Sequence, residues 1–124
     1  LGVDQTKPSE LIAVLSTRGP TLVLIDDCLT VGDPTGDLAR LVARPPEGVH
    51  VIASAHPSRI RQAYGHWSAD LAASRAGILL QPDPLDGDLL GAPLPSRLGR
   101  IEIPGRGFLV ADGRARLAQI VHRV

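Results

Sequence analysis

Two short aliphatic runs constrain the fold of this chain more than any other feature. Residues 21–25 have the sequence Thr-Leu-Val-Leu-Ile, and residues 49–53 have the sequence Val-His-Val-Ile-Ala. A continuous apolar run of this length predicts a strand that is buried on both faces, as in a parallel sheet. Between the two runs, Asp33-Pro34 opens a helical pattern with apolar residues on one side. The alternation of strand, helix and strand predicts an α/β unit.

The rest of the chain extends this pattern. We expect further helices from Pro8 to before Gly19-Pro20, and from Pro57 through Leu71 with a pause at Gly65. We also expect a third strand at 78–80, a helical turn at 86–90, and strands at 100–103, 107–110 and 117–121, with a hairpin turn at Asp112-Gly113. In adjacent parallel strands, nearly complete burial is expected for Leu22, Val23, Leu24, Ile25, Val51, Ile52 and Leu79.

Composition limits the kind of protein. A length of 124 residues predicts one domain, 1–124, and a hydrophobic fraction of 44% argues against disorder. The single cysteine, Cys28, excludes a disulfide framework and a cysteine-based zinc site. No apolar stretch is long enough to span a membrane. Because the sequence has no methionine, even at position 1, we interpret it as a piece of a longer chain.

Charge is divided unevenly along the chain. Residues 97–124 hold six arginines and two acidic residues, a net charge of +4, so residues 1–96 carry −4. The arginines favour a solvated edge hairpin protected from edge-to-edge pairing. A nucleic-acid-binding face is the alternative.

Two acidic residues, Asp26 and Asp27, directly follow the first apolar run. A buried strand that ends in two carboxylates is the Walker B arrangement, in which one acid helps to hold Mg²⁺ and the next polarises a water. The alternative is a pair of polar residues that mark a strand end and a turn. Ser54 follows the second run, and the carboxyl ends of parallel strands share one edge. We therefore expect Asp26, Asp27 and Ser54 to cluster in one ligand-sized cleft.

A phosphate-binding P-loop is excluded within these residues. That loop needs Gly-Lys-Ser/Thr, and the one lysine of the chain, Lys7, stands between Thr6 and Pro8. If the chain belongs to a nucleotide hydrolase, the phosphate-binding half lies upstream. We therefore expect these 124 residues alone to hydrolyse no ATP.

An ordered set of segments resembles the FtsK/SpoIIIE ATPase family. The segments are residues 22–27, 49–57 (Val-His-Val-Ile-Ala-Ser-Ala-His-Pro), 77–80, 86–91 (Asp-Gly-Asp-Leu-Leu-Gly), 94–95 and 105–110 (Gly-Arg-Gly-Phe-Leu-Val). Their order and spacing fit the second half of one ATPase domain. The Gly-Arg-Gly segment and Gln119-Ile120-Val121 most resemble the last ATPase module of EccC-type proteins, the membrane-bound motors of type VII secretion.

The resemblance implies a partial RecA-like P-loop fold, with a mostly parallel sheet and a C-terminal antiparallel hairpin, that lacks its P-loop half. It implies ATP and Mg²⁺ as cofactors. Asp26 would bind the metal and thereby the nucleotide, Asp27 would activate water, and Ser54 would keep the hydroxyl of a γ-phosphate-sensing Ala-Thr-Gln-Arg-Pro segment. Ala55 and His56 depart from that segment, which implies a weakened or degenerate site.

The resemblance also implies partners and a location. These are the rest of the same ATPase domain, a homo-oligomer such as a hexamer, a secreted helical protein as substrate, and the cytoplasmic side of the cell membrane. Two other functions stay open, a DNA translocase module and a non-catalytic interaction domain with an ATPase fold. The net −4 charge of residues 1–96 favours a protein partner over DNA.

Overall fold

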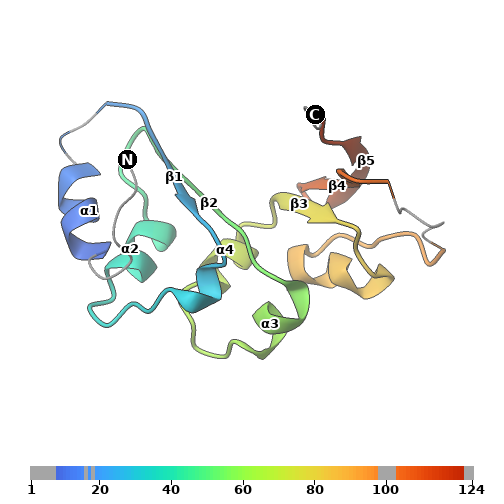
Figure 1. Ribbon diagram of the computed structural model, residues 1–124, viewed down its shortest axis with the longest axis horizontal. Coiled ribbons are helices and arrows are strands. Elements are labelled where there is room, and N and C mark those ends of the chain that lie inside the picture. Colours follow the sequence, from blue (N-terminus) through green and yellow to red (C-terminus); the bar gives the residue numbers. More distant parts are fainter. Residues whose placement is uncertain (1–7, 16, 18, 98–102, 122–124) are drawn as a thin grey trace. The chain divides into compact units, whose positions relative to one another are not determined.

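The computed structural model describes residues 8–15, 17, 19–97 and 103–121 of a mixed α/β chain (Figure 1). These residues fall into two compact units, one within Leu1–Leu71 and the other within Ala72–Val124. Each unit is built around its own small sheet. In the described part of the chain, no helix is long and apolar enough to cross a membrane.

The first unit contains a two-stranded parallel sheet and short helices. Strands β1 (Thr21–Ile25) and β2 (Val49–Ala53) pair in parallel, from Thr21 opposite Val49 to Ile25 opposite Ala53. The helices are α1 (Pro8–Leu15), α2 (Asp37–Ala43) and α3 (Pro57–Gln62), with a short 3-10 helix, η1 (Cys28–Thr30), directly after β1. Both predicted strands are thus confirmed, and so is the parallel α/β arrangement between them.

Helices α1 and α2 cover one face of this sheet. Val23 of β1 and Val49 of β2 pack against Leu15 of α1 and Leu41 of α2. A second apolar cluster, formed by Cys28, Leu38 and Trp67, continues the core beyond the end of β1. Helix α2 begins later than the sequence predicts, at Asp37 after the N-cap residue Gly36, and the Asp33 carboxylate accepts the backbone N–H groups of Leu38 and Ala39 near its start.

The opposite face of the sheet is exposed, which corrects the prediction of burial on both sides. Leu22, Leu24 and Ile52 are 54%, 69% and 58% exposed. The reason is the alternation of side chains along a strand, which places these three opposite Val23 and Val51. Helices α1 and α2 pack on the Val23 side. A parallel sheet with one bare apolar face is unusual, because such sheets are normally covered on both sides.

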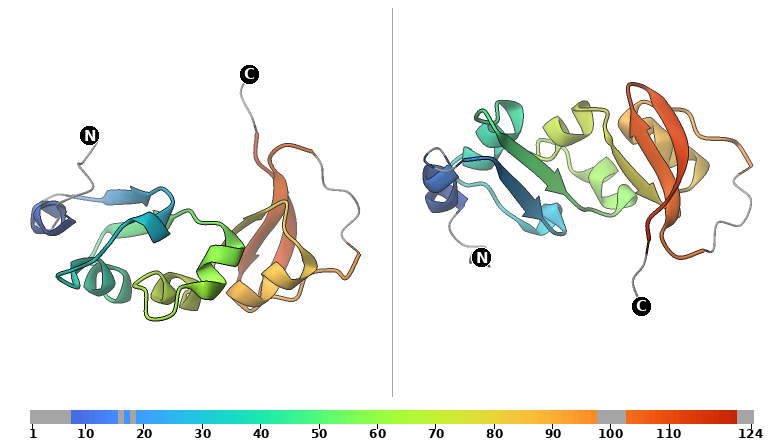
Figure 2. Two further views of the ribbon diagram at one scale, coloured as in Figure 1. Left: turned by 60° about the horizontal axis from the view of Figure 1, so that its bottom comes forward. Right: turned by 90° about the horizontal axis from the view of Figure 1, so that it is seen from above.

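The second unit is an antiparallel sheet in the order β3-β4-β5. Its strands are β3 (Gly77–Leu80), β4 (Arg106–Ala111) and β5 (Arg114–Gln119). Figure 2 shows the 3-10 helix η2 (Pro84–Leu90) against this sheet, where Leu90 packs on the buried Leu79, Ala92 and Val110. The predicted hairpin turn is confirmed, since Asp112 and Gly113 both have positive φ, as a two-residue type I′ turn requires.

The third predicted strand lies where expected but pairs differently. Strand β3 joins β4 in antiparallel register, with Leu79 opposite Phe108, and not a parallel neighbour. Leu79 is buried as predicted, but in the core of the second unit. Among the described residues, the parallel part of the structure is therefore limited to β1 and β2, and the prediction of a mostly parallel sheet is wrong for them.

Other element boundaries differ modestly. The pause predicted at Gly65 within the helix from Pro57 through Leu71 is confirmed: α3 ends at Gln62, Gly65 has a φ of +70° in the break, and the second helix is α4 (Ala69–Ala73). The helical turn predicted at 86–90 is the longer η2, and the last strand, predicted at 117–121, begins three residues earlier and ends two residues earlier. Of the strand predicted at 100–103, residues 100–102 lie outside the described part, and Ile103 belongs to no strand.

Candidate functional site

Three of the predicted site residues meet at the carboxyl edge of the parallel sheet. Asp26 and Asp27 follow β1, and Ser54 follows β2, whose last residue pairs with the last residue of β1. The backbone of Ser54 donates its N–H to the Ile25 carbonyl and accepts the N–H of Cys28, both at 2.9 Å. These bonds extend the sheet by one step, and they bring the residues Asp26, Asp27 and Ser54 together as the sequence predicts.

The hydroxyl group of Ser54 connects the two acidic residues. Its Oγ donates a hydrogen bond to Oδ1 of Asp26 at 2.5 Å and accepts the backbone N–H of Asp27 at 2.9 Å. The Asp27 N–H also contacts Oδ1 of Asp26 at 3.1 Å. A hydroxyl has one proton. Since Ser54 gives its proton to Asp26, its role here is to position the acid pair.

The two carboxylates have different surroundings. Within the described residues, Oδ2 of Asp26 accepts no hydrogen bond, so it stays available to a ligand. The Asp27 carboxylate, in contrast, forms an ion pair with Arg59 of α3. The Arg59 Nη1 atom lies 3.1 Å from one oxygen and 3.0 Å from the other.

Asp27 has an unusual backbone conformation. Its φ of 42° and ψ of 61° lie in the left-handed region, which non-glycine residues adopt at some cost and which aspartate tolerates better than most. The Ser54 hydroxyl and the Arg59 guanidinium hold the backbone and the side chain of Asp27 in this position. Backbone strain of this kind tends to occur at functional sites.

Arg59 is the site residue that the sequence reasoning did not identify. It lies five positions after Ser54, on the helix that begins just after β2, so it emerges from the same edge of the sheet. That placement was a usable signal, because the segment after a strand of a parallel sheet contributes to the ligand-binding edge. The ion pair itself joins residues 32 positions apart, and the sequence pattern does not reveal it.

Two neighbouring residues serve local structure. Ala55 is partly buried and packs against the cluster of Cys28, Leu38 and Trp67. His56 is exposed, precedes α3 and places its Nδ1 at 2.8 Å from the Ser58 hydroxyl. Neither side chain forms a hydrogen bond with the acid pair.

The donor set fits Mg²⁺ only as part of a larger site. Mg²⁺ is usually held by one or two carboxylates together with waters and substrate phosphates. Asp26 supplies a free carboxylate oxygen, and Asp27 is a second acid beside it. No group of three or more acidic, histidine or cysteine side chains is placed to hold a metal in the described residues. The edge could therefore support a metal that is bound mainly by another ligand.

Burial affects the only cysteine of the chain, which is next to the acid pair. Cys28 is almost completely buried, and this burial, followed by the nearby charge of Asp27, raises the pKa of its thiol above 9.0. The thiol is therefore protonated at neutral pH, which argues against a role as a nucleophile.

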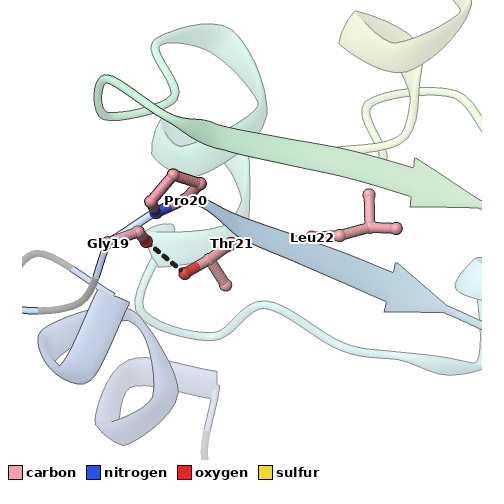
Figure 3. Close-up of a pocket in the computed structure, with 4 residues that line it drawn as sticks. All are labelled: Gly19, Pro20, Thr21 and Leu22. Atoms are coloured by element: carbon pink, nitrogen blue, oxygen red, sulfur yellow. Dashed lines mark hydrogen bonds between the residues drawn. The ribbon is translucent and has the colours of Figure 1, made fainter.

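A shallow cavity of about 550 Å³ lies at the other end of β1 (Figure 3). It is lined by Gly19, Pro20, Thr21 and Leu22, and the Thr21 hydroxyl donates to the Gly19 carbonyl at 2.8 Å. Ligands of open parallel sheets bind beyond the carboxyl ends of the strands, and this cavity is at the amino end. We therefore place the candidate site at Asp26, Asp27 and Ser54.

No family model matches this chain, and no curated protein or solved structure shows significant similarity to it. The resemblance to the FtsK/SpoIIIE family therefore stays a prediction from the residues quoted above.

Proposed function

We propose that this chain is part of an ATP-driven motor ATPase of the FtsK/SpoIIIE type, a module similar to those of EccC proteins. The edge formed by Asp26, Asp27 and Ser54 would be the magnesium and water side of its nucleotide site. One observation carries the proposal. The Ser54 hydroxyl, at the end of β2, forms hydrogen bonds with both acidic residues at the end of the neighbouring strand β1. A RecA-like fold would place the remaining nucleotide contacts on an upstream half.

The two acids would have separate roles. Asp26 has the carboxylate oxygen that can face a metal, directly or through its water shell, while Ser54 fixes the orientation of the carboxylate. Bound Mg²⁺ would supply positive charge against the phosphate groups. Asp27 would orient or polarise the attacking water, but only after its carboxylate separates from Arg59.

The bare face of the parallel sheet supports a proposed partner. Leu22, Leu24 and Ile52 form an apolar surface on a sheet type that is normally covered on both faces. We propose that the phosphate-binding half of the same ATPase domain covers this surface. Assembly into a hexamer, a secreted helical protein as substrate, and a position at the cytoplasmic side of the cell membrane remain parts of the same proposal.

A non-catalytic interaction domain is the second candidate. Two observations favour it, the neutralisation of Asp27 by Arg59 and the commitment of Ala55 to packing against the Cys28 cluster. A module of this kind would bind a nucleotide or a protein without turnover. A DNA translocase module has less support, with two exposed arginines, Arg114 and Arg116, on β5.

Hydrolysis assays separate these functions. The natural protein that contains this chain should hydrolyse ATP in a magnesium-dependent way, and the isolated 124 residues should not. Turnover by the isolated chain would contradict the proposal of an incomplete site. Magnesium-dependent nucleotide binding without turnover in the natural protein would favour the interaction domain. A steep loss of DNA binding with salt would favour the translocase.

A further inference from the structure

The proposed water-activating acid, Asp27, forms an ion pair with Arg59 that is open to solvent. The pair is formed on the surface, with side chains 50% exposed for Arg59 and 46% for Asp27. Both carboxylate oxygens contact the same guanidinium nitrogen, at 3.0 and 3.1 Å. Exposed ion pairs contribute little free energy and are screened by salt, so a competing ligand can break them at low cost.

The guanidinium group has a second class of natural ligand. Arginine binds phosphate oxygens in the same way as carboxylate oxygens, with several donors in one plane. A phosphate that approaches this edge of the sheet therefore competes with Asp27 for Arg59. Both Asp27 oxygens contact the same nitrogen, Nη1, so a phosphate that binds at Nη1 displaces Asp27, and the two binding events are then reciprocally coupled.

We propose that Arg59 is a phosphate-responsive positioning residue that holds Asp27 in place while the site is empty and exchanges this contact for a phosphate group when a ligand arrives. The proposal rests on the proposed function, because it assigns the ligand as a polyphosphate such as the phosphate chain of a nucleotide. In the empty state, the Asp27 carboxylate is paired with the Arg59 guanidinium. After the exchange, the Asp27 carboxylate is released toward water and Arg59 neutralises phosphate charge.

Competition gives an unusual prediction for Asp27. Replacement of a proposed catalytic acid normally leaves ligand binding unchanged or weakens it. Here Asp27→Asn removes the competing anion, so pyrophosphate without metal should bind more tightly, by about fivefold for one unit charge removed near the guanidinium. Asparagine is tolerated in the left-handed region, so this variant keeps the local backbone.

The experiment is a titration of the 124-residue chain with inorganic pyrophosphate in the absence of divalent metal. Binding is followed by NMR at the backbone amides of Asp27 and Cys28 and at the Arg59 side chain. We expect Asp27→Asn to bind more tightly than the wild type, Arg59→Gln to lose binding, and Arg59→Lys to retain part of it. The double variant Asp27→Asn with Arg59→Gln should behave like Arg59→Gln alone.

The ion pair between Asp37 and Arg40 on α2 provides matched controls. Asp37→Asn and Arg40→Gln make the same charge changes elsewhere in the first unit, and they should leave pyrophosphate binding as in the wild type. Equal affinities for Asp27→Asn and Asp37→Asn would overturn the proposal, because the effect would then come from net charge alone. Unchanged binding in Arg59→Gln, or no binding in any variant, would overturn it as well.

A negative result in this test would overturn the role of Arg59 without overturning the proposed ATPase function. Pyrophosphate competition is measured without metal and without turnover, and it does not involve Asp26. In the natural protein, Arg59→Gln should raise KM for ATP more than it lowers kcat, and Arg59→Lys should restore KM in part. If magnesium-dependent turnover depends on Asp26 while Arg59→Gln leaves KM unchanged, the ATPase proposal holds and the role of Arg59 is wrong.

Discussion

The Ser54 hydroxyl donates a hydrogen bond to Oδ1 of Asp26 across 2.5 Å, although 28 positions separate the two residues in the sequence. The bond joins the end of β2 to the residue just after β1. It orients the carboxylate that has a free oxygen for a ligand, and the same hydroxyl accepts the N–H of Asp27. Ser54 is therefore the residue on which the geometry of both acids depends.

Ser54→Ala should destabilise the first unit by about 1 kcal/mol, because the Asp26 carboxylate loses a donor and the Asp27 N–H loses an acceptor. Urea denaturation measures this change in the free energy of unfolding. Ser58→Ala is the control, since Ser58 is also an exposed serine bonded to a single side chain, that of His56. Equal losses in the two variants would show that Ser54 has no special structural role.

Gly107→Ala should unfold or severely destabilise the second unit, by about 3 kcal/mol or more. A Cβ at Gly107 would lie 2.1 Å from the carbonyl oxygen of Leu79 on the neighbouring strand, so β3 and β4 could not keep their spacing. Gly32→Ala is the control, because nothing lies within 4 Å of a Cβ there. Circular dichroism during thermal unfolding follows both variants, and similar melting curves would contradict the observed pairing of β3 with β4.

Adjacent residues of β1 should differ sharply in their contribution to stability. Val23 is buried between the sheet and its helices, so Val23→Ala should cost about 1–3 kcal/mol in the isolated chain. Leu24 is 69% exposed, so Leu24→Ala should cost less than about 1 kcal/mol there. In the natural protein, where the proposed upstream half covers Leu24, Leu24→Ala should cost about 2–5 kcal/mol. Chemical denaturation of both forms measures the difference, and an unchanged cost for Leu24→Ala would mean that this face stays bare.

Stability should fall at alkaline pH because of Cys28. Its folded-state pKa is raised above 9.0 by burial, so the unfolded thiol ionises first as the pH rises. The contribution is therefore complete below about pH 9 and is lost between the unfolded and folded pKa values. Urea midpoints at neutral and alkaline pH, compared with those of Cys28→Ala, isolate this loss from other titrations. A wild type that loses no more stability than Cys28→Ala would contradict the burial of the thiol.

In the first unit, the sequence was sufficient to predict both strands and the residues that meet at their carboxyl ends. The apolar runs at 21–25 and 49–53 define β1 and β2, and parallel pairing then brings Asp26 and Ser54 to one edge. It was not sufficient for burial. A continuous run such as Thr-Leu-Val-Leu-Ile does not show that only alternate residues are covered by helices of the same chain, and so Leu24 was wrongly expected in the core.

The second unit was harder to predict for a related reason. The run Ile78-Leu79-Leu80 is too short to show whether its partner is parallel or antiparallel. Pairing was decided by β4, where Gly107 permits the close approach to β3 that a side chain would prevent. Arg59 was missed because its partner Asp27 is 32 positions away in the sequence, and only the tertiary structure brings the two side chains together.

The most direct test of the central claim is the effect of Asp26→Ala on magnesium-dependent ATP binding and turnover by the natural protein. If Asp26 faces the metal, this variant should lose magnesium-dependent affinity or turnover, while Asp37→Ala, which breaks an ion pair on α2, should behave as the wild type. If Asp26→Ala leaves both nucleotide affinity and rate unchanged, the paired acids only mark the end of β1, and the interaction domain is the better account.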